Sequence, residues 1–209
     1  MQYIISILIA FLMGAIPWPY IVGKTTKHID IRKHGSKNPG AGNIFHLVSW
    51  RAGIVALLGD MAKGYFALYF IYRLYHFSPV LLTYFGLIAV FGHVFSPFLQ
   101  FKGGKGAATT LGVFLFILPL VVQARSVLLL ILVAIPWSIM LIITHSQVVS
   151  LFVTVPFFPL VLWFMTHDAN LVTSVIIFVI FMEILGIKST KREWPIAYEK
   201  YVKKYFRRS

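Results

Sequence analysis

The stretch YIISILIAFLMGAIPWPYIV, residues 3–22, decides the fold class of this chain. It contains no charged side chain, and an α-helix that crosses the hydrocarbon core of a bilayer needs about 20 predominantly apolar residues. Only Met1 and Gln2 precede it, and its apolar run is longer than that of a secretory signal. We therefore expect a membrane-spanning helix that is retained in the protein.

The chain as a whole is also strongly apolar. Of the 209 residues, 59% are apolar and 12% are charged, and the mean hydropathy is +0.83. Soluble domains carry about 25% charged residues, so a soluble enzyme is excluded. We predict an all-α integral membrane protein with seven transmembrane helices, forming a single membrane domain over residues 1–209. The predicted spans are Tyr3–Val22, Ala52–Tyr72, Pro79–Phe101, Gly106–Val122, Ser126–Thr144, Val148–Thr166 and Leu171–Ile187.

The basic residues divide unequally between the two sides that these spans define. One side receives Lys24, Lys27, Arg32, Lys33, Lys37, Arg51, Lys102, Lys105, Lys188, Lys191, Arg192, Lys200, Lys203, Lys204, Arg207 and Arg208. The other side receives Arg73 and Arg125, and Lys63 lies inside the second span. Because cytoplasmic loops carry the excess of Lys and Arg, we expect the N-terminus outside and the C-terminus in the cytoplasm.

Residues 188–209 form the predicted cytoplasmic tail. Its aromatic residues Trp194, Tyr198, Tyr201 and Tyr205 recur at helical spacing, with basic residues between them. This pattern predicts a basic amphipathic helix on the membrane surface. A solvated tail without fixed structure is the alternative.

Two glycine-rich segments lie on the predicted cytoplasmic side. The first glycine loop, GSKNPGAGN at residues 35–43, can turn tightly and direct several backbone N–H groups at one point, with positive charge from Lys37 and His46 nearby. The second glycine loop, FKGGKG at residues 101–106, places two lysines around a glycine pair at the start of a predicted helix, which favours a phosphate or carboxylate. The alternatives are a turn without a ligand and a lysine anchor at the membrane surface.

Ionisable residues also occur inside the predicted spans. Asp60 and Lys63 lie at i, i+3 in the second span, so they share one helix face and can pair. Such residues are costly in a membrane and are functional by default, although an ion pair that positions helices is an equal alternative. His93 is a candidate base or ligand, or a satisfied histidine facing a polar cavity, and Glu183 can snorkel towards the surface.

Other catalytic machinery is absent from the sequence. The lack of cysteine excludes disulfides, Cys-zinc sites and acyl-cysteine intermediates. There is no His-x4-Asp pair, no His-Glu-x-x-His helix and no Gly-x-Ser-x-Gly elbow. A reaction here would depend on positioning and electrostatics, acting on an already activated substrate, without a metal or cofactor.

The two glycine loops resemble motifs of the PlsY family of bacterial integral-membrane acyltransferases. The first loop is similar to the family pattern Gly-Ser-x-Asn-x-Gly-Ala-x-Asn. Gly92-His93, Pro97 and the second loop are similar to the family's Gly-His, Pro and Phe-Lys-Gly-Gly-Lys-Gly. The likeness is clearest over residues 10–115, including the run from Asp60 to Gly64.

The resemblance implies a reaction in the bacterial cell membrane, with the active site at the cytoplasmic face. An acyl chain moves from acyl phosphate to the 1-hydroxyl of glycerol 3-phosphate, or of a related phosphorylated acceptor, without a covalent protein nucleophile. By position, Ser36 and Lys105 are the implied catalytic residues, and Asp60, Lys63 and His93 support the site. The implied substrate-binding residues are Asn38, Gly40, Asn43, His46, Lys102, Gly103 and Gly104. Membrane lipids are further partners, and nucleic acid is not.

The sequence departs from the family pattern in three places. Gly42 stands where Thr is usual, and His46 stands where Arg is usual, which replaces a permanent bidentate charge by one that varies near neutral pH. The third family motif, of His-Arg-x-Asn type, has no counterpart in Ile187–Trp194. The second hypothesis is therefore an altered or inactive paralogue that binds anionic phospholipid or partners with lipid-synthesis enzymes. A transporter of a phosphorylated solute is the third.

Overall fold

The computed structural model describes residues 1–144 and 157–197, and these residues form helices joined by short connections, with no β-strand among them. The chain divides into two compact units, residues 1–123 and 124–209. The helices of the first unit are α1 (Gln2–Ala15), α2 (Trp18–Lys27), α3 (Ala41–Leu47), α4 (Trp50–Tyr75), α5 (Pro79–Val94), the 3-10 turn η1 (Pro97–Leu99) and α6 (Ala107–Val122). The second unit contains α7 (Ser126–Thr144), α9 (Phe157–Thr166) and α10 (Ala169–Ala197), and the turn η2 (Gln123–Arg125) precedes them.

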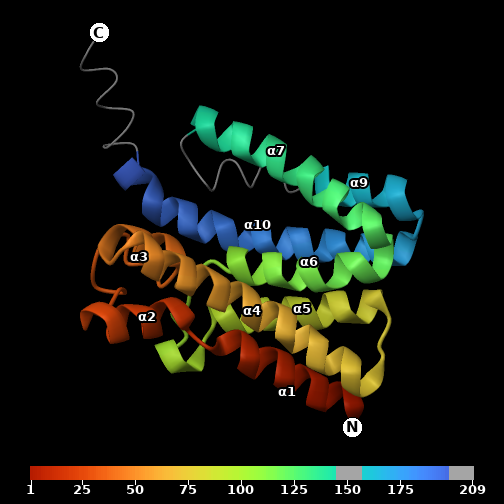
Figure 1. Ribbon diagram of the computed structural model, residues 1–209, viewed down its shortest axis with the longest axis horizontal. Helices are drawn as coiled ribbons and strands as arrows, with labels where there is room; N and C mark the ends of the chain where they lie inside the picture. The colour runs from red at the N-terminus through yellow and green to blue at the C-terminus, as the bar shows by residue number, and fades with distance from the viewer. Residues whose placement is uncertain (145–156, 198–209) are drawn as a thin grey trace. The chain divides into compact units, whose positions relative to one another are not determined.

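The core of the first unit is a bundle of α1, α4, α5 and α6 (Figure 1). Helix α1 packs on α4 and α5, and α6 packs on the other side of the same pair. Helices α2 and α3 pack against α4 at one end of the bundle. The connections from α2 to α3 and from α5 to α6 lie at that end, so the bundle places both glycine loops together.

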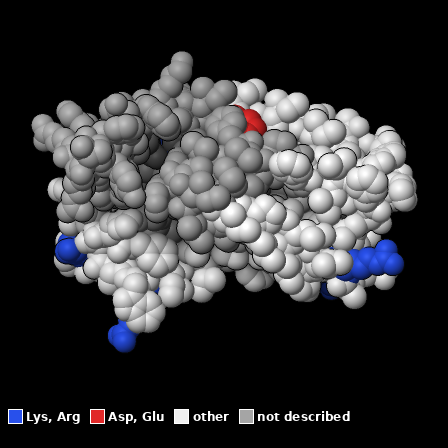
Figure 2. Space-filling view, turned by 90° about the horizontal axis from the view of Figure 1, so that it is seen from above, with Lys and Arg blue, Asp and Glu red and all other residues white. Residues whose placement is uncertain are grey.

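Four helical segments of the described residues are long and apolar enough to cross a membrane. They are Gln2–Lys27, Trp50–Tyr75, Pro79–Leu99 and Ala107–Leu129, and two shorter apolar helices are Phe157–Thr166 and Ala169–Leu185. Most of the described surface drawn in Figure 2 is uncharged, with Lys and Arg confined to a few places at its edges. The all-helical class is confirmed, whereas the count of seven spans, the orientation and the single membrane domain stay predictions.

The expected sixth span and the tail fall partly outside the described residues. Of the span predicted over Val148–Thr166, the structure describes only the part that forms α9. Helix α10 continues to Ala197, ten residues beyond the predicted end of the seventh span, so the tail begins as an extension of that helix. Residues 198–209 lie outside the described part of the chain, and the surface helix there stays a prediction.

The first predicted span is broken, where the sequence analysis expected one continuous helix over Tyr3–Val22. Helix α1 ends at Ala15 because Pro17 disfavours helical backbone at the residue before it, and Ile16 has an extended ψ of 119°. Pro19 has no N–H with which to continue the helical hydrogen bond to the Ala15 carbonyl. The break therefore releases two carbonyl groups inside the bundle.

Both carbonyls accept hydrogen bonds from side chains elsewhere in the bundle. The Ser96 hydroxyl, from the connection after α5, donates to the Ala15 oxygen at 2.6 Å. The Lys63 ammonium, from the middle of α4, donates to the Ile16 oxygen at 2.8 Å. Buried backbone carbonyls are costly when unsatisfied, so these two bonds tie α1 to the bundle at its break.

Glycines allow the helices of the bundle to approach closely. On the α1–α5 contact, a methyl group on Gly14 would overlap the carbonyl of Ala89. On the α4–α6 contact, a methyl on Gly64 would overlap the carbonyl of Thr109, and one on Gly112 that of Met61. Small residues that bring backbones together are the usual device of helix packing in membranes, where lipid is as apolar as the side chains.

Gly14→Ala is therefore expected to destabilise the first unit. The added methyl group meets main-chain atoms of α5, which cannot rotate away, and overpacking of this kind typically costs about 1–3 kcal/mol. Thermal unfolding of the detergent-solubilised protein measures the effect as a lowered midpoint, and Gly14→Ser should lower it further. An unchanged midpoint for both variants would contradict the close contact of α1 with α5.

Candidate active site

The first glycine loop is held in shape by the side chain of Asn43. Its carbonyl oxygen accepts a hydrogen bond from the Ser36 N–H at 3.1 Å, and its NH2 group donates to the backbone oxygens of Ile31 at 2.9 Å and His34 at 3.1 Å. Gly35, at φ +58°, makes room for the amide, because a methyl group there would overlap the Asn43 carbonyl oxygen. The Asn43 side chain is buried and cross-links the loop, and its direct contact with a substrate stays a prediction.

Ser36 and Asn38 lie at the tip of this loop. Ser36 is exposed, and its hydroxyl accepts a hydrogen bond from the Asn38 N–H at 3.4 Å. The side-chain oxygen of Asn38 is buried without a hydrogen-bond partner among the described residues. Because an unpaired buried polar atom in a native structure requires an explanation, Asn38 is a candidate ligand contact. Rotation of the Asn38 side-chain amide by 180° puts its NH2 group at the position of this oxygen, so the residue can offer either an acceptor or donors there.

The loop does not stay irregular to its predicted end. Gly40 is the N-cap of α3, so the last three residues of the loop form the first turn of that helix. His46 lies in the last turn of α3 and is exposed. Residues 23–51, which lie between the first two predicted spans, were expected to be a connection, and this short helix within them was not predicted.

The second glycine loop turns sharply before α6. Gln100 and Phe101 have φ values of 57° and 60°, and Gly106, the N-cap of α6, has φ +88°. The Gly103 N–H donates to the Val94 oxygen at 2.9 Å, which folds the loop back onto the end of α5. A methyl group on Gly103 would overlap the carbonyl of His93. The glycine pair is therefore required by close backbone approach.

Gly104 is the point where the two glycine loops meet. A methyl group on Gly104 would overlap Nε2 of His93 and would lie 3.3 Å from the backbone oxygen of Pro39. The structure thus brings the predicted segments of residues 35–43 and 101–106 together at Gly104, with Nε2 of His93 against the same glycine. Lys105, half-buried, follows Gly104 directly, and Lys102 is exposed on the other side of the glycine pair.

Beneath the loops lies a buried polar cluster of Asp60, Lys63 and His93. The Lys63 ammonium lies 2.8 Å from the Asp60 carboxylate and 2.7 Å from Nδ1 of His93, and each of the three residues is at most 6% exposed. The predicted pairing of Asp60 with Lys63 is therefore present. His93, predicted as a supporting residue, joins this pair to the second glycine loop. Among the described residues, no three His, Asp or Glu side chains group as metal ligands.

A second ion pair fixes the chain just before the first glycine loop. The Arg32 guanidinium donates to both oxygens of Asp30, at 3.0 and 2.9 Å, and lies 5.0 Å from the centre of the Tyr20 ring. Its other NH2 group reaches the Leu99 oxygen at 3.5 Å, next to the second glycine loop. The hydrogen bonds from Arg32 lower the pKa of the Asp30 carboxyl from 3.8 to about 2. This pair thus connects the bases of both loops.

The Asp30–Arg32 pair predicts a pH dependence of stability. The pKa of Asp30 is lower in the folded state than in the unfolded state. The pair therefore stabilises the folded protein at pH values above 3.8, and this contribution is lost as the pH falls towards about 2. The pair is partly exposed, so the effect is about 1 kcal/mol or less. Thermal midpoints of the wild type and Asp30→Asn should differ by a constant amount near neutrality and converge below 3.8. A difference that grows on acidification would contradict the assignment.

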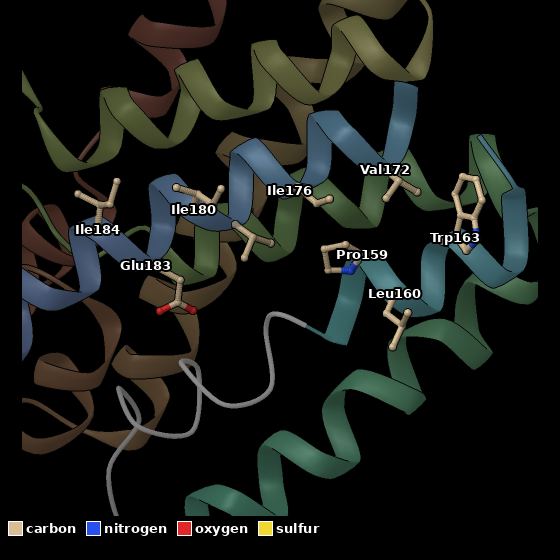
Figure 3. Close-up of a pocket in the computed structure, with 9 residues that line it drawn as sticks. Pro159, Leu160, Trp163, Val172, Ile176, Ile180, Glu183 and Ile184 are labelled. Atoms are coloured by element: carbon tan, nitrogen blue, oxygen red, sulfur yellow. The ribbon is translucent and has the colours of Figure 1, made fainter. Parts of the chain in front are cut away.

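The second unit contains an apolar hollow between α9 and α10, with a volume of about 590 Å³ (Figure 3). Helix α9 contributes Pro159, Leu160 and Trp163, and α10 contributes a row of Val and Ile side chains. Glu183 lies at one end of this row and is the acidic residue in the lining. From the sequence, Glu183 was predicted to lie in the seventh span and to snorkel towards the surface; the lining of this hollow was not predicted.

Several residues of the site were not predicted from the sequence. The carbonyls of Pro39 and Ile16 contribute backbone atoms, and Ser96 holds the helix break. The Pro17 and Pro19 pair inside an apolar run was the available signal for the break. Thr109, in the first turn of α6 after the second glycine loop, carries a buried hydroxyl without a hydrogen-bond partner among the described residues.

Fold and site together define an integral membrane protein with two basic, glycine-rich loops that meet over a buried ion pair. The sequence model of the glycerol-3-phosphate acyltransferase family matches residues 4–192, and the chain belongs to that family. A glycerol-3-phosphate acyltransferase of Bacillus subtilis is 40% identical over 185 residues, which cover 87% of this chain and 90% of the relative. Another, from Fusobacterium nucleatum, is 37% identical over 186 residues, 87% of this chain and 89% of the relative.

Solved structures agree at the level of the fold. The glycerol 3-phosphate form of PlsY (YgiH), an integral membrane glycerol 3-phosphate acyltransferase, matches with a TM-score of 0.76 over 94% of both chains, at 23% identity. The lysophosphatidic acid form of PlsY gives a TM-score of 0.74. The resemblance to this family is thus confirmed, and the protein is a bacterial membrane acyltransferase of phospholipid synthesis.

Proposed function

We propose that this acyltransferase takes its acyl chain from acyl phosphate and transfers it to the 1-hydroxyl of glycerol 3-phosphate, giving lysophosphatidic acid and inorganic phosphate. The observation that carries the proposal is the contact at Gly104, where both glycine loops meet beside Lys105. Both substrates carry a phosphate, and glycine loops at a helix N-terminus suit phosphates because their backbone N–H groups converge. The relatives named as glycerol-3-phosphate acyltransferases support the acceptor.

In this proposal the site residues act mainly as donors to phosphate oxygens. Lys105 and Lys102 supply positive charge around Gly103 and Gly104, and Ser36 supplies a hydroxyl from the opposite loop. Further contacts with the substrates come from Asn38, Gly40 and His46 in and next to the first glycine loop. Asn43 holds that loop in shape through its hydrogen bonds with the backbone. Lys105 stabilises the negative charge that develops as the acyl–phosphate bond breaks.

The chemistry requires no covalent intermediate on the protein. The 1-hydroxyl oxygen attacks the acyl carbonyl carbon, the bond from that carbon to the phosphate oxygen breaks, and the proton of the hydroxyl passes to the departing phosphate. Because phosphate is already a good leaving group, the rate acceleration comes from holding the two substrates in reacting geometry. Ser36 is then a binding and positioning group at the reacting centre, without being acylated.

We propose further that the site faces the cytoplasm and that the chain crosses the membrane seven times. The distribution of lysines and arginines over the predicted loops supports the orientation. Both glycine loops lie at the end of the bundle where Lys24, Lys27 and Arg51 also lie, which agrees with a cytoplasmic end. Substituted cysteines at Lys37 and Arg73 provide the test, because this cysteine-free chain gives no background labelling. Labelling of Arg73→Cys from outside intact cells, and of Lys37→Cys only after permeabilisation, is the expected result.

Purified protein in detergent, supplied with acyl phosphate and glycerol 3-phosphate, is expected to produce lysophosphatidic acid, and mass spectrometry can identify it. Treatment with hydroxylamine after incubation with acyl phosphate alone should release no acyl chain from the protein. Turnover with acyl-CoA but not with acyl phosphate would overturn the donor assignment. Binding of glycerol 3-phosphate without turnover would favour the second hypothesis, an altered paralogue, which His46 and the missing third motif motivate.

A further inference from the structure

The buried ammonium of Lys63 makes three close polar contacts. Its nitrogen lies 2.8 Å from the Ile16 oxygen, 2.8 Å from the Asp60 carboxylate and 2.7 Å from Nδ1 of His93. A lysine ammonium has three N–H groups and no acceptor. The contact with Ile16 is a hydrogen bond from Lys63, and the contact with Asp60 is an ion pair. The carboxylate of Asp60 balances the charge inside the bundle.

The third of these contacts determines where His93 carries its proton. A neutral imidazole has one protonated nitrogen and one acceptor nitrogen. Because an ammonium has no acceptor, the 2.7 Å contact between Lys63 and Nδ1 is a hydrogen bond only if Nδ1 accepts. A proton on Nδ1 would point at the ammonium, and the neighbouring Asp60 oxygen, at 3.6 Å, is too far to accept it well. The proton of His93 is therefore placed on Nε2.

Nε2 is also the nitrogen that faces the glycine loops. It lies against Gly104, at the point that the Pro39 oxygen approaches from the other loop, and makes no hydrogen bond within residues 1–144 and 157–197. A methyl group on Gly104 would occupy the place in front of it. The ring thus joins the charged pair below to the loop junction above, with an N–H pointing towards the junction.

We infer that the Asp60–Lys63 pair is a positioning device that holds His93 as the Nε2-protonated tautomer, so that His93 donates a hydrogen bond to the phosphate held at the junction of the glycine loops. This inference rests on the proposed function for the identity of the anion. It explains why an ion pair is retained inside an apolar helix, because the pair sets the direction of a donor at the site. Lys63 acts through His93 and does not touch the substrate.

The tautomer can be read directly. In the full-length protein labelled with 15N-histidine, long-range 1H–15N correlation spectra distinguish the two neutral forms, and loss of a signal set in His93→Gln assigns His93. The expected result is a protonated Nε2 and an unprotonated Nδ1, with a shift of the Nε2–H signal when glycerol 3-phosphate is added. A proton on Nδ1 would overturn the inference, whether or not the enzyme turns over.

Two double variants separate positioning from folding. Asp60→Asn/Lys63→Gln removes both charges but retains an amide donor for Nδ1, and should keep the Nε2–H form. Asp60→Ala/Lys63→Met removes the charges and the donor together, and should give a mixture of tautomers. Both avoid leaving one buried charge unpaired, which strongly destabilises a fold. Equal tautomer populations in the two folded proteins would overturn the role of Lys63.

Binding of glycerol 3-phosphate tests the role of Nε2. Glutamine can place its NH2 group near the position of Nε2, whereas asparagine reaches only to that of Nδ1. His93→Asn is expected to raise the dissociation constant of glycerol 3-phosphate by about tenfold or more, as loss of a charge-assisted hydrogen bond predicts. His93→Gln should recover most of the affinity for glycerol 3-phosphate. In both variants KM should change in parallel with the dissociation constant, and kcat should change less. Equal affinities for both variants would overturn the donor role.

These measurements keep the inference distinct from the proposed function. The tautomer and the dissociation constant are measured without acyl transfer, so a protein that binds glycerol 3-phosphate but makes no lysophosphatidic acid can still support the inference. Conversely, an active enzyme whose His93 carries its proton on Nδ1 supports the function and overturns the inference. Inorganic phosphate as a second ligand shows whether the donor recognises the phosphate alone.

Discussion

Lys105→Ala is expected to lower kcat/KM for acyl transfer by about 10²–10³-fold, the usual effect of removing one preorganised donor from a reacting centre. Lys105 follows the glycine at which the two loops meet and precedes the N-cap of α6, so its charge adds to the partial positive charge of the helix end. Arginine at the same position keeps the charge but not the compact ammonium, and Lys105→Arg should recover only part of the activity. Initial rates at varied glycerol 3-phosphate give the values of kcat and KM.

Lys33→Ala is the matched control for this experiment. Lys33 is an exposed cation shortly before the first glycine loop, and its main chain alone contributes a hydrogen bond to the turn with Asp30. Its loss changes the net charge of the loop region as Lys105→Ala does, so a general electrostatic effect would appear in both variants. Equal activities of the two variants would contradict the role of Lys105.

Gly103→Ala is the second change expected to have a large effect, with a loss of kcat/KM of about 100-fold, the effect of misplacing reacting groups by about 1 Å. The new methyl group would overlap the carbonyl of His93 and lie 2.8 Å from the carbonyl of Val94, both of which are main-chain atoms at the end of α5. The second glycine loop must then move away from α5, and the donors at its tip move with it. Steady-state kinetics and a thermal unfolding curve should be recorded on the same preparation.

Gly42→Ala provides the corresponding control in the first glycine loop. Apart from its chain neighbours and the backbone of its own helix, no atom of the described residues lies within 4 Å of the position that its methyl group would take, and the residue lies within α3. Alanine in a helix is favoured over glycine by roughly 0.5–1 kcal/mol, so this variant should retain its activity and unfold at the same temperature or slightly higher. A similar loss of activity in both variants would contradict the argument from close packing.

Patterns in the sequence predicted the parts of the site that local chemistry determines. The spacing of Asp60 and Lys63 indicated a pair on one helix face, and the pair is present. The two glycine-rich segments were predicted to lie on one side, and they meet at Gly104. The apolar runs predicted helices, and α1, α4, α5, α6, α7 and α10 begin within two residues of the expected positions, whereas α2 and α3 were not predicted as separate helices.

Features that depend on three-dimensional packing could not be predicted in the same way. Asn43 was predicted to bind substrate, but no spacing rule indicates that its amide would cross-link the loop to Ile31 and His34. The contact of His93 with both Lys63 and Gly104 joins residues far apart in the sequence through the packing of α4 on α5. The first span is long and apolar enough to cross a membrane, but its expected continuity was wrong, because hydropathy averages over Pro17 and Pro19 without registering their effect on hydrogen bonding.

The helix break at Ile16 also bears on how the chain is assembled by the translocon. A nascent chain that has emerged only as far as Tyr75 can offer Lys63 the carboxylate of Asp60 and the Ile16 carbonyl, but His93 has not yet been synthesised. A lysine in a lipid-exposed helix is costly, so release of α4 into the bilayer is favoured when the broken helix ahead of it is already in place. Insertion of this protein is therefore expected to proceed through pairs of helices rather than one helix at a time. The Ile16 carbonyl at the discontinuity near the N-terminus is then already in place to accept a hydrogen bond from Lys63 when α4 leaves the translocon.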